Sequence, residues 1–130
     1  MRMLTGTKCM QTIRLIVRAR GSRTQGLSTP DMALTASTNG IVNGQWNNIV
    51  ATFDGVNKRI YVNGVLRSTS ANLTGTVTAN TTGASYIGIY GNFAGYPFNG
   101  RISATQVYNR ALSDAEVLAN FNTLKGRYGL

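Results

Sequence analysis

The first regular pattern in the chain is an alternation of apolar and polar residues near its N-terminus. Apolar residues occupy positions 13, 15, 17 and 19, whereas Arg14, Arg18 and Arg20 fall on the opposite side together with Ile16. A period of two residues is the geometry of a half-buried β-strand. The pattern therefore predicts a strand over residues 13–19, followed by a loop rich in Gly, Ser and Thr over residues 21–30.

A denser series of strand and turn signals follows between residues 46 and 67. One apolar run ends at Asp54-Gly55 and the next ends at Asn63-Gly64. These dipeptides supply the positive φ angles that tight hairpin turns require. The segment therefore predicts strand, loop, strand, tight turn and strand. Further strands are predicted over residues 86–90 and 98–108, and residues 68–85 fit either a long exposed loop or weak polar strands.

One helix is predicted near the C-terminus. Ser113 and Glu116 have the spacing of a capping box, and apolar residues then recur at helical spacing. Leu112 precedes the cap and is expected to pack against Val117. The helix is expected to end near residue 124 or 125, with the glycine at 126 as its C-terminal cap.

Short strands, closely spaced turns and a single late helix predict an all-β fold. We expect an antiparallel β-sandwich of the jelly-roll type with one short C-terminal helix, built as a single domain over residues 1–130. The large apolar side chains are expected to fill the space between two sheets. The predicted core consists of Trp46, Phe53, Tyr61, Ile87, Phe98, Ile102 and Tyr108.

Charge is distributed unevenly along the chain. The protein has 13 basic residues, four acidic residues and a net charge of +9, and residues 1–25 hold six of the basic residues and no acid. Such a segment fits first a solvated strand face, then an acidic protein partner, and least of all nucleic acid. The candidate basic docking face consists of Arg14, Arg18, Arg20 and Arg23.

The sequence offers little material for catalysis or metal binding. It contains no His, which excludes His-based triads and His metal ligands. Glycosidases need two carboxylates at one bond and calcium needs several oxygen ligands, but two of the four acids belong to the predicted helix start. We therefore expect no enzyme activity, no catalytic residues, no metal and no cofactor. No apolar run reaches the ~18 residues that span a bilayer.

The order of motifs from residue 44 onward resembles laminin-G-like domains, a branch of the concanavalin A-like jelly rolls. In that family a Trp enters a strand ending in Phe-Asp-Gly, and a Tyr-Val-Asn-Gly hairpin, Ile-Gly, Phe-x-Gly-x-Ile and Tyr-Asn-Arg-Ala-Leu-Ser follow. Here these motifs are residues 46–55, 61–64, 87–88, 98–102 and 108–113. The resemblance covers residues 44–130, whereas residues 1–43 are basic and atypical for the family.

The last residues, 120–130, resemble the ends of laminin-G-like proteins in tailed bacteriophages. This resemblance implies a non-enzymatic virion structural module, a capsid decoration or tail-associated protein that docks on other virion proteins and is located in the virion. The short N-terminal part leaves open whether residues 13–19 pair within their own sheet or with a neighbour, and an uncovered sheet edge favours a homo-oligomer.

The alternative implied by the same family is a lectin-like adhesion module that binds host or matrix glycans outside the cell. Glycan binding needs aromatic side chains beside amide groups, and one loop has that composition. Its candidate contact residues are Tyr90, Asn92, Phe93 and Tyr96. A packing or interface role for its aromatic residues is the competing interpretation.

Overall fold

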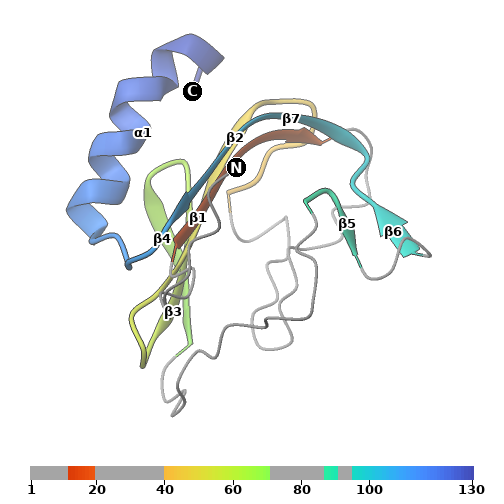
Figure 1. Cartoon of the computed structure of the whole chain (residues 1–130). Helices are drawn as coiled ribbons and strands as arrows, with labels where there is room; N and C mark the ends of the chain where they lie inside the picture. The colour runs from red at the N-terminus through yellow and green to blue at the C-terminus, as the bar shows by residue number, and fades with distance from the viewer. Residues whose placement is uncertain (1–11, 20–39, 71–86, 91–94) are drawn as a thin grey trace, which may run out of the picture.

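The largest unit of the molecule is a five-stranded antiparallel sheet with strand order β4-β3-β2-β1-β7. The computed structural model describes residues 12–19, 40–70, 87–90 and 95–130. A two-stranded hairpin and one helix complete the described part (Figure 1). The elements are β1 (Thr12–Ala19), β2 (Asn47–Phe53), β3 (Lys58–Val62), β4 (Val65–Ser70), β5 (Ile89–Tyr90), β6 (Gly95–Pro97), β7 (Gly100–Tyr108) and α1 (Asp114–Tyr128). The prediction of an all-β antiparallel fold with one C-terminal helix is confirmed.

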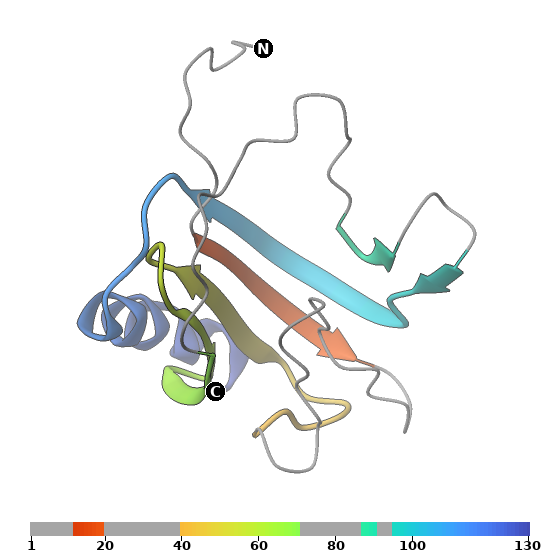
Figure 2. The ribbon, with the colours of Figure 1, turned by 90° about the horizontal axis from the view of Figure 1, so that it is seen from below.

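The N-terminal strand β1 lies inside its own sheet. It pairs with β2 on one side and with β7 on the other, so that Thr12 stands opposite both Thr52 and Tyr108. Figure 2 shows β1 between these two strands along their whole length. The expected strand is therefore confirmed, and it completes the sheet of this chain.

The alternation of side chains gives the sheet two different faces. On the helix face, Val50 and Tyr61 pack against Leu112, which lies just before α1, and against Val117 near the start of α1. On the other face, Val17, Ile49 and Ile60 form a separate buried cluster. Figure 1 places α1 and the β5–β6 hairpin on opposite sides of the sheet, so we call the second face the hairpin face.

The Asn63-Gly64 turn has the backbone that its sequence predicts. Asn63 has φ 51° and Gly64 has φ 78°, both in the left-handed region. The side-chain oxygen of Asn63 accepts the N–H of Asn48 at 2.8 Å, which ties the turn to β2. A Cβ at Gly64 would lie 2.8 Å from the Phe121 ring, so glycine also lets the turn approach α1 closely.

Helix α1 is longer than expected. It ends at Tyr128, and Gly129 closes it with φ 67° and an N–H bond to the Lys125 carbonyl. The expectation of an end near residue 124 or 125, with the glycine at 126 as cap, is wrong. A helical glycine costs about 1 kcal/mol relative to alanine, and contacts of Tyr128 with Trp46 and Ser103 favour the extra turn.

The core differs in part from the set of large apolar residues expected to form it. Tyr61 is buried as predicted, whereas Trp46, Phe53 and Tyr108 are only half-buried. Ile87, Phe98 and Ile102 are exposed by 49%, 38% and 37%, and the prediction is wrong for them. The real core consists mainly of aliphatic side chains on the central strands, because both faces of those strands are covered.

Candidate functional site

Asp54 organises the turn between β2 and β3. Its carboxylate accepts the N–H groups of Val56 at 3.0 Å and Asn57 at 2.7 Å, and Arg59 donates to it at 2.7 Å. These bonds, that of Asn57 first, hold the pKa of Asp54 far below its usual range. The carboxylate therefore remains ionised and committed to the turn.

Asp114 is held by a buried tyrosine. The Tyr61 hydroxyl donates a hydrogen bond to Asp114 Oδ1 at 2.6 Å, joining β3 to the first turn of α1. Burial first, and then this hydrogen bond, raise the pKa of Tyr61 to about 12. Asp114 thus has a structural role at the start of the helix.

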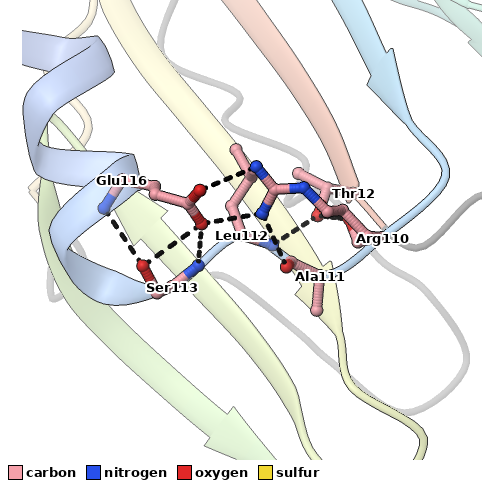
Figure 3. Close-up of polar contacts among 6 residues, drawn as sticks. All are labelled: Thr12, Arg110, Ala111, Leu112, Ser113 and Glu116. Atoms are coloured by element: carbon pink, nitrogen blue, oxygen red, sulfur yellow. Dashed lines mark hydrogen bonds and ion pairs between the residues drawn. The ribbon is translucent and has the colours of Figure 1, made fainter.

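Glu116 completes the capping box of α1 and binds Arg110 (Figure 3). Arg110 donates to both carboxylate oxygens, at 2.8 and 2.7 Å, and the Ser113 N–H donates at 2.9 Å. The Arg110 bond is the main cause that lowers the pKa of Glu116 to about 2. Thr12 fixes the same segment to β1, because its hydroxyl donates to the Arg110 carbonyl and accepts the Leu112 N–H.

The acids of the described segments therefore serve the fold. Among the described residues, no cluster of three or more His, Cys, Asp or Glu could hold a metal ion. The same part of the chain contains no helix long and apolar enough to cross a membrane.

The predicted contact loop lies in the β5–β6 hairpin. Tyr90 is in β5, opposite Gly95 of β6, and Tyr96 is the next residue of β6. The structure places the backbone of these two tyrosines on adjacent strands. Asn92 and Phe93 lie outside the described residues.

Exposed apolar side chains gather at the base of this hairpin. The Phe98 N–H donates to the Gly88 carbonyl at 2.7 Å, and a Cβ at Gly88 would lie 3.3 Å from Ile102 Cδ1. Ile87, Phe98 and Ile102 therefore surround Gly88 and remain exposed, and we call these three residues the hairpin patch. Sequence reasoning assigned them to the core because their size and apolarity alone do not tell whether anything covers them.

The predicted basic docking face is only partly present. Arg14 is buried, with 4% exposure, and its Nη1 donates to Gln106 Oε1 at 2.8 Å on the helix face. Its assignment to an exposed docking face is wrong, because Arg14 stands opposite Val50 on the helix face, where Leu112 and Val117 pack against the sheet. Arg18 is exposed, and Arg20 and Arg23 lie outside the described residues.

Arg18 instead has a basic neighbour that the sequence did not indicate. It stands directly opposite Arg101 in the β1–β7 pairing, and both side chains are exposed. Nearby, the rings of Trp46 and Tyr128 meet edge to face at 5.5 Å, and the Tyr128 hydroxyl lies 2.9 Å from Ser103 Oγ. We call these five residues the basic end. The alternation of residues in β1 predicts on which face of the sheet Arg18 lies. Its pairing with Arg101 depends on the register between β1 and β7, which are far apart in the sequence.

The comparison with protein families identifies this architecture. A family model described as the concanavalin A-like lectin/glucanases superfamily, of the laminin-G type, matches residues 10–118. The chain belongs to this superfamily. The concanavalin A-like match includes β1, so residues 10–43 belong to the domain despite their atypical sequence.

Solved structures with the same fold agree with this assignment. A candidate carbohydrate-binding protein from Bacteroides ovatus has TM-score 0.67 and 17% identity, over 88% of this chain and 41% of its own. Domain 4 of an extracellular arabinanase from Geobacillus stearothermophilus, in complex with arabinotriose, has TM-score 0.65 and 19% identity, over 89% of this chain and 68% of that one. This chain therefore spans less than half the length of the Bacteroides protein. At these identities the likeness shows the fold.

A more distant likeness extends to a toxin. The binding domain of botulinum neurotoxin DC, in complex with rat synaptotagmin II, has TM-score 0.50 and 14% identity, over 87% of this concanavalin A-like chain and 35% of its own. A comparison with curated proteins found no match.

Proposed function

We propose that the protein is a non-enzymatic, lectin-like module that binds carbohydrate through the hairpin patch and the adjacent β5–β6 hairpin. The observation that carries the proposal is the exposure of Ile87, Phe98 and Ile102 around Gly88. Grouped apolar side chains at a surface mark a binding site more often than scattered ones do. Sugar rings present C–H faces that pack well against such side chains.

The fold relatives support a carbohydrate as the ligand. The arabinanase domain shares the fold and is in complex with arabinotriose, and the Bacteroides protein is described as a candidate carbohydrate binder.

The chemistry of the described acids supports binding without catalysis. Asp54, Asp114 and Glu116 each accept hydrogen bonds from the protein itself. Hydrolysis of a glycosidic bond would need a free acid and base facing one site. The expectation of a virion structural role stays a prediction, and the comparisons favour the carbohydrate-binding alternative over it.

A matched pair of variants tests the proposal. Phe98→Ser removes the aromatic ring of the hairpin patch. The control, Val107→Ser, removes an apolar side chain of β7 outside the patch, and this side chain is more exposed (56%) than that of Phe98 (38%). On an array of neutral plant and bacterial glycans, we expect saturable binding by the native chain. We expect Phe98→Ser to weaken it about tenfold or more, which corresponds to about 1.4 kcal/mol, and Val107→Ser to leave it unchanged.

Equal affinities of the native chain and Phe98→Ser would contradict the assignment of the site. An array with no bound glycan at all would contradict the carbohydrate-binding function itself. Release of reducing sugar during incubation with a bound glycan would overturn the non-enzymatic part of the proposal.

A further inference from the structure

The basic end, on the helix face away from the hairpin patch, has an arrangement that the fold itself does not explain. Arg18 and Arg101 are direct cross-strand neighbours, and both are exposed. Opposite residues in an antiparallel pair lie about 4.5–5.5 Å apart at Cα, where two like charges destabilise the sheet. The pair therefore costs stability unless an anion lies between the two guanidinium groups.

No described carboxylate is in a position to supply that anion. Asp54, Asp114 and Glu116 lie at the opposite end of the sheet, near Thr12, and each already has a partner. Strand β1 separates Thr12 from Arg18 by six residue steps, or roughly 20 Å. That distance exceeds the Debye length of about 8 Å at physiological ionic strength, so these acids do not neutralise the arginines.

Aromatic and hydroxyl groups lie beside the arginine pair. Val17 pairs with Asn47 at the end of the β1–β2 pairing, and the next residues of the two segments are Arg18 in β1 and Trp46 just before β2. Trp46 is half-buried against Tyr128, and Ser103 contacts the Tyr128 hydroxyl from β7. Arg127 adds a third cation, with its guanidinium carbon 5.8 Å from the centre of the Tyr128 ring. Guanidinium groups bind carboxylate and sulfate groups in a bidentate manner, and the ring edges and hydroxyls suit a sugar.

We propose that the basic end binds an acidic sugar, with the carboxylate or sulfate group held between Arg18 and Arg101 and the sugar ring against Trp46 and Tyr128. This inference rests on the proposed carbohydrate-binding function and adds to it a second site with a preference for anionic glycans. The hairpin patch has the apolar contacts for a neutral part of a chain, and the basic end has the charge for an acidic part.

The protein has a single tryptophan, and it belongs to the basic end, so its fluorescence reports on this site alone. The full chain is titrated with oligogalacturonate, which carries carboxylates, with a heparin hexasaccharide, which also carries sulfates, and with neutral arabinotriose. A single-stranded oligodeoxynucleotide of equal charge completes the set. We expect a saturable change in Trp46 emission with one or both acidic sugars, which identifies the preferred anion, and none with arabinotriose.

The variants Arg18→Gln and Arg101→Gln are expected to weaken the binding of acidic sugar about tenfold each, since each removes charged hydrogen bonds. Arg67→Gln removes an exposed arginine from β4, at the far edge of the sheet, and is expected to change the affinity less than twofold. Thermal melting of each variant checks that the fold is kept. The two arginine variants are expected to melt no lower than the native chain, because each relieves the like-charge pair.

Equal losses in all three variants would overturn the proposal, because they would indicate attraction to overall positive charge. Tighter binding of the oligonucleotide than of either acidic sugar would also overturn it, in favour of a nucleic-acid site. If neutral glycans bind and depend on Phe98 while acidic sugars leave Trp46 emission unchanged, this inference fails and the proposed function stands. If no sugar of either kind binds, the proposed function fails, and this inference fails with it.

Discussion

Arg14 is a charged side chain in the interior of the molecule. Its Nη1 bonds Gln106, but its Nη2 is buried and has no hydrogen-bond partner. Burial of a guanidinium without a full set of partners costs free energy. Replacement of a buried charged group by an apolar side chain of similar volume is often neutral or stabilising, by about 1–4 kcal/mol.

We therefore predict that Arg14→Met leaves the free energy of unfolding unchanged or raises it, as measured by urea denaturation. Arg67→Met, at an exposed position on β4, serves as the control for the loss of one positive charge. A loss of more than about 1 kcal/mol in Arg14→Met, beyond that in the control, would mean that the guanidinium has a stabilising role that its contacts do not show.

The alternation of residues predicts the correct side of β1 for Arg14 but not the surroundings of its side chain. Alternation with a period of two assigns Arg14, Ile16 and Arg18 to one face, and the structure agrees. Whether that face meets solvent depends on α1, which lies nearly a hundred residues later in the chain. Ile87, Phe98 and Ile102 illustrate the converse, because their apolarity predicts burial while nothing in the described segments covers them.

At the scale of elements, local signals were the most reliable. The Asn63-Gly64 turn and the cap at Ser113 are encoded within four residues, and the structure confirms both. The predicted end of α1 is wrong because the actual end depends on contacts of Tyr128 with Trp46, just before β2, and with Ser103 in β7. The pairing that creates the basic end was likewise not predictable, since register between β1 and β7 is a long-range property.

The start of α1 can be tested on its own. Ser113 Oγ accepts the Glu116 N–H at 3.3 Å, and Glu116 bonds the Ser113 N–H in return. Removal of such a cap typically costs about 1 kcal/mol. We therefore predict that Ser113→Ala lowers the free energy of unfolding by about this amount, as measured by thermal denaturation. Thr123→Ala, at an exposed position within the same helix, is the matched control and is expected to have little effect. Equal melting temperatures of both variants and the native chain would show that the cap contributes nothing to stability.

At the scale of the whole molecule, the described charges are separated along the sheet. The acids and their partners lie at the end formed by Thr12, the β2–β3 turn and the start of α1. Arg18, Arg101 and Arg127 lie at the other end, near the end of α1. One end is therefore held together by ion pairs and hydrogen bonds, while none of the described acids lies at the other end.

This separation leads to a definite dependence of stability on pH. The folded state lowers the pKa of Glu116 from 4.5 to about 2, and it also lowers that of Asp54. A group whose pKa is lowered by folding contributes stability that is complete at pH values above its pKa in the unfolded chain. This contribution is lost as the pH falls through its pKa in the folded protein. The folded state raises the pKa of Tyr61 from 10.0 to about 12, so its contribution is complete below 10.0 and is lost as the pH rises toward 12.

The chain has no histidine, the residue whose ordinary pKa lies near neutral pH. We predict a nearly constant melting temperature from about pH 5 to 9, with a decrease on both sides. Glu116→Gln should reduce the decrease on the acid side, and Tyr61→Phe should reduce that on the alkaline side, because each removes one of the shifted groups. If the melting temperature of Tyr61→Phe fell as steeply above pH 10 as that of the native chain, the hydrogen bond from Tyr61 to Asp114 would not be the cause of the alkaline loss of stability. A melting temperature that rises steadily with pH toward the isoelectric point near 10.5, and that neither variant alters, would show that the global repulsion of a chain with net charge +9 outweighs these local interactions.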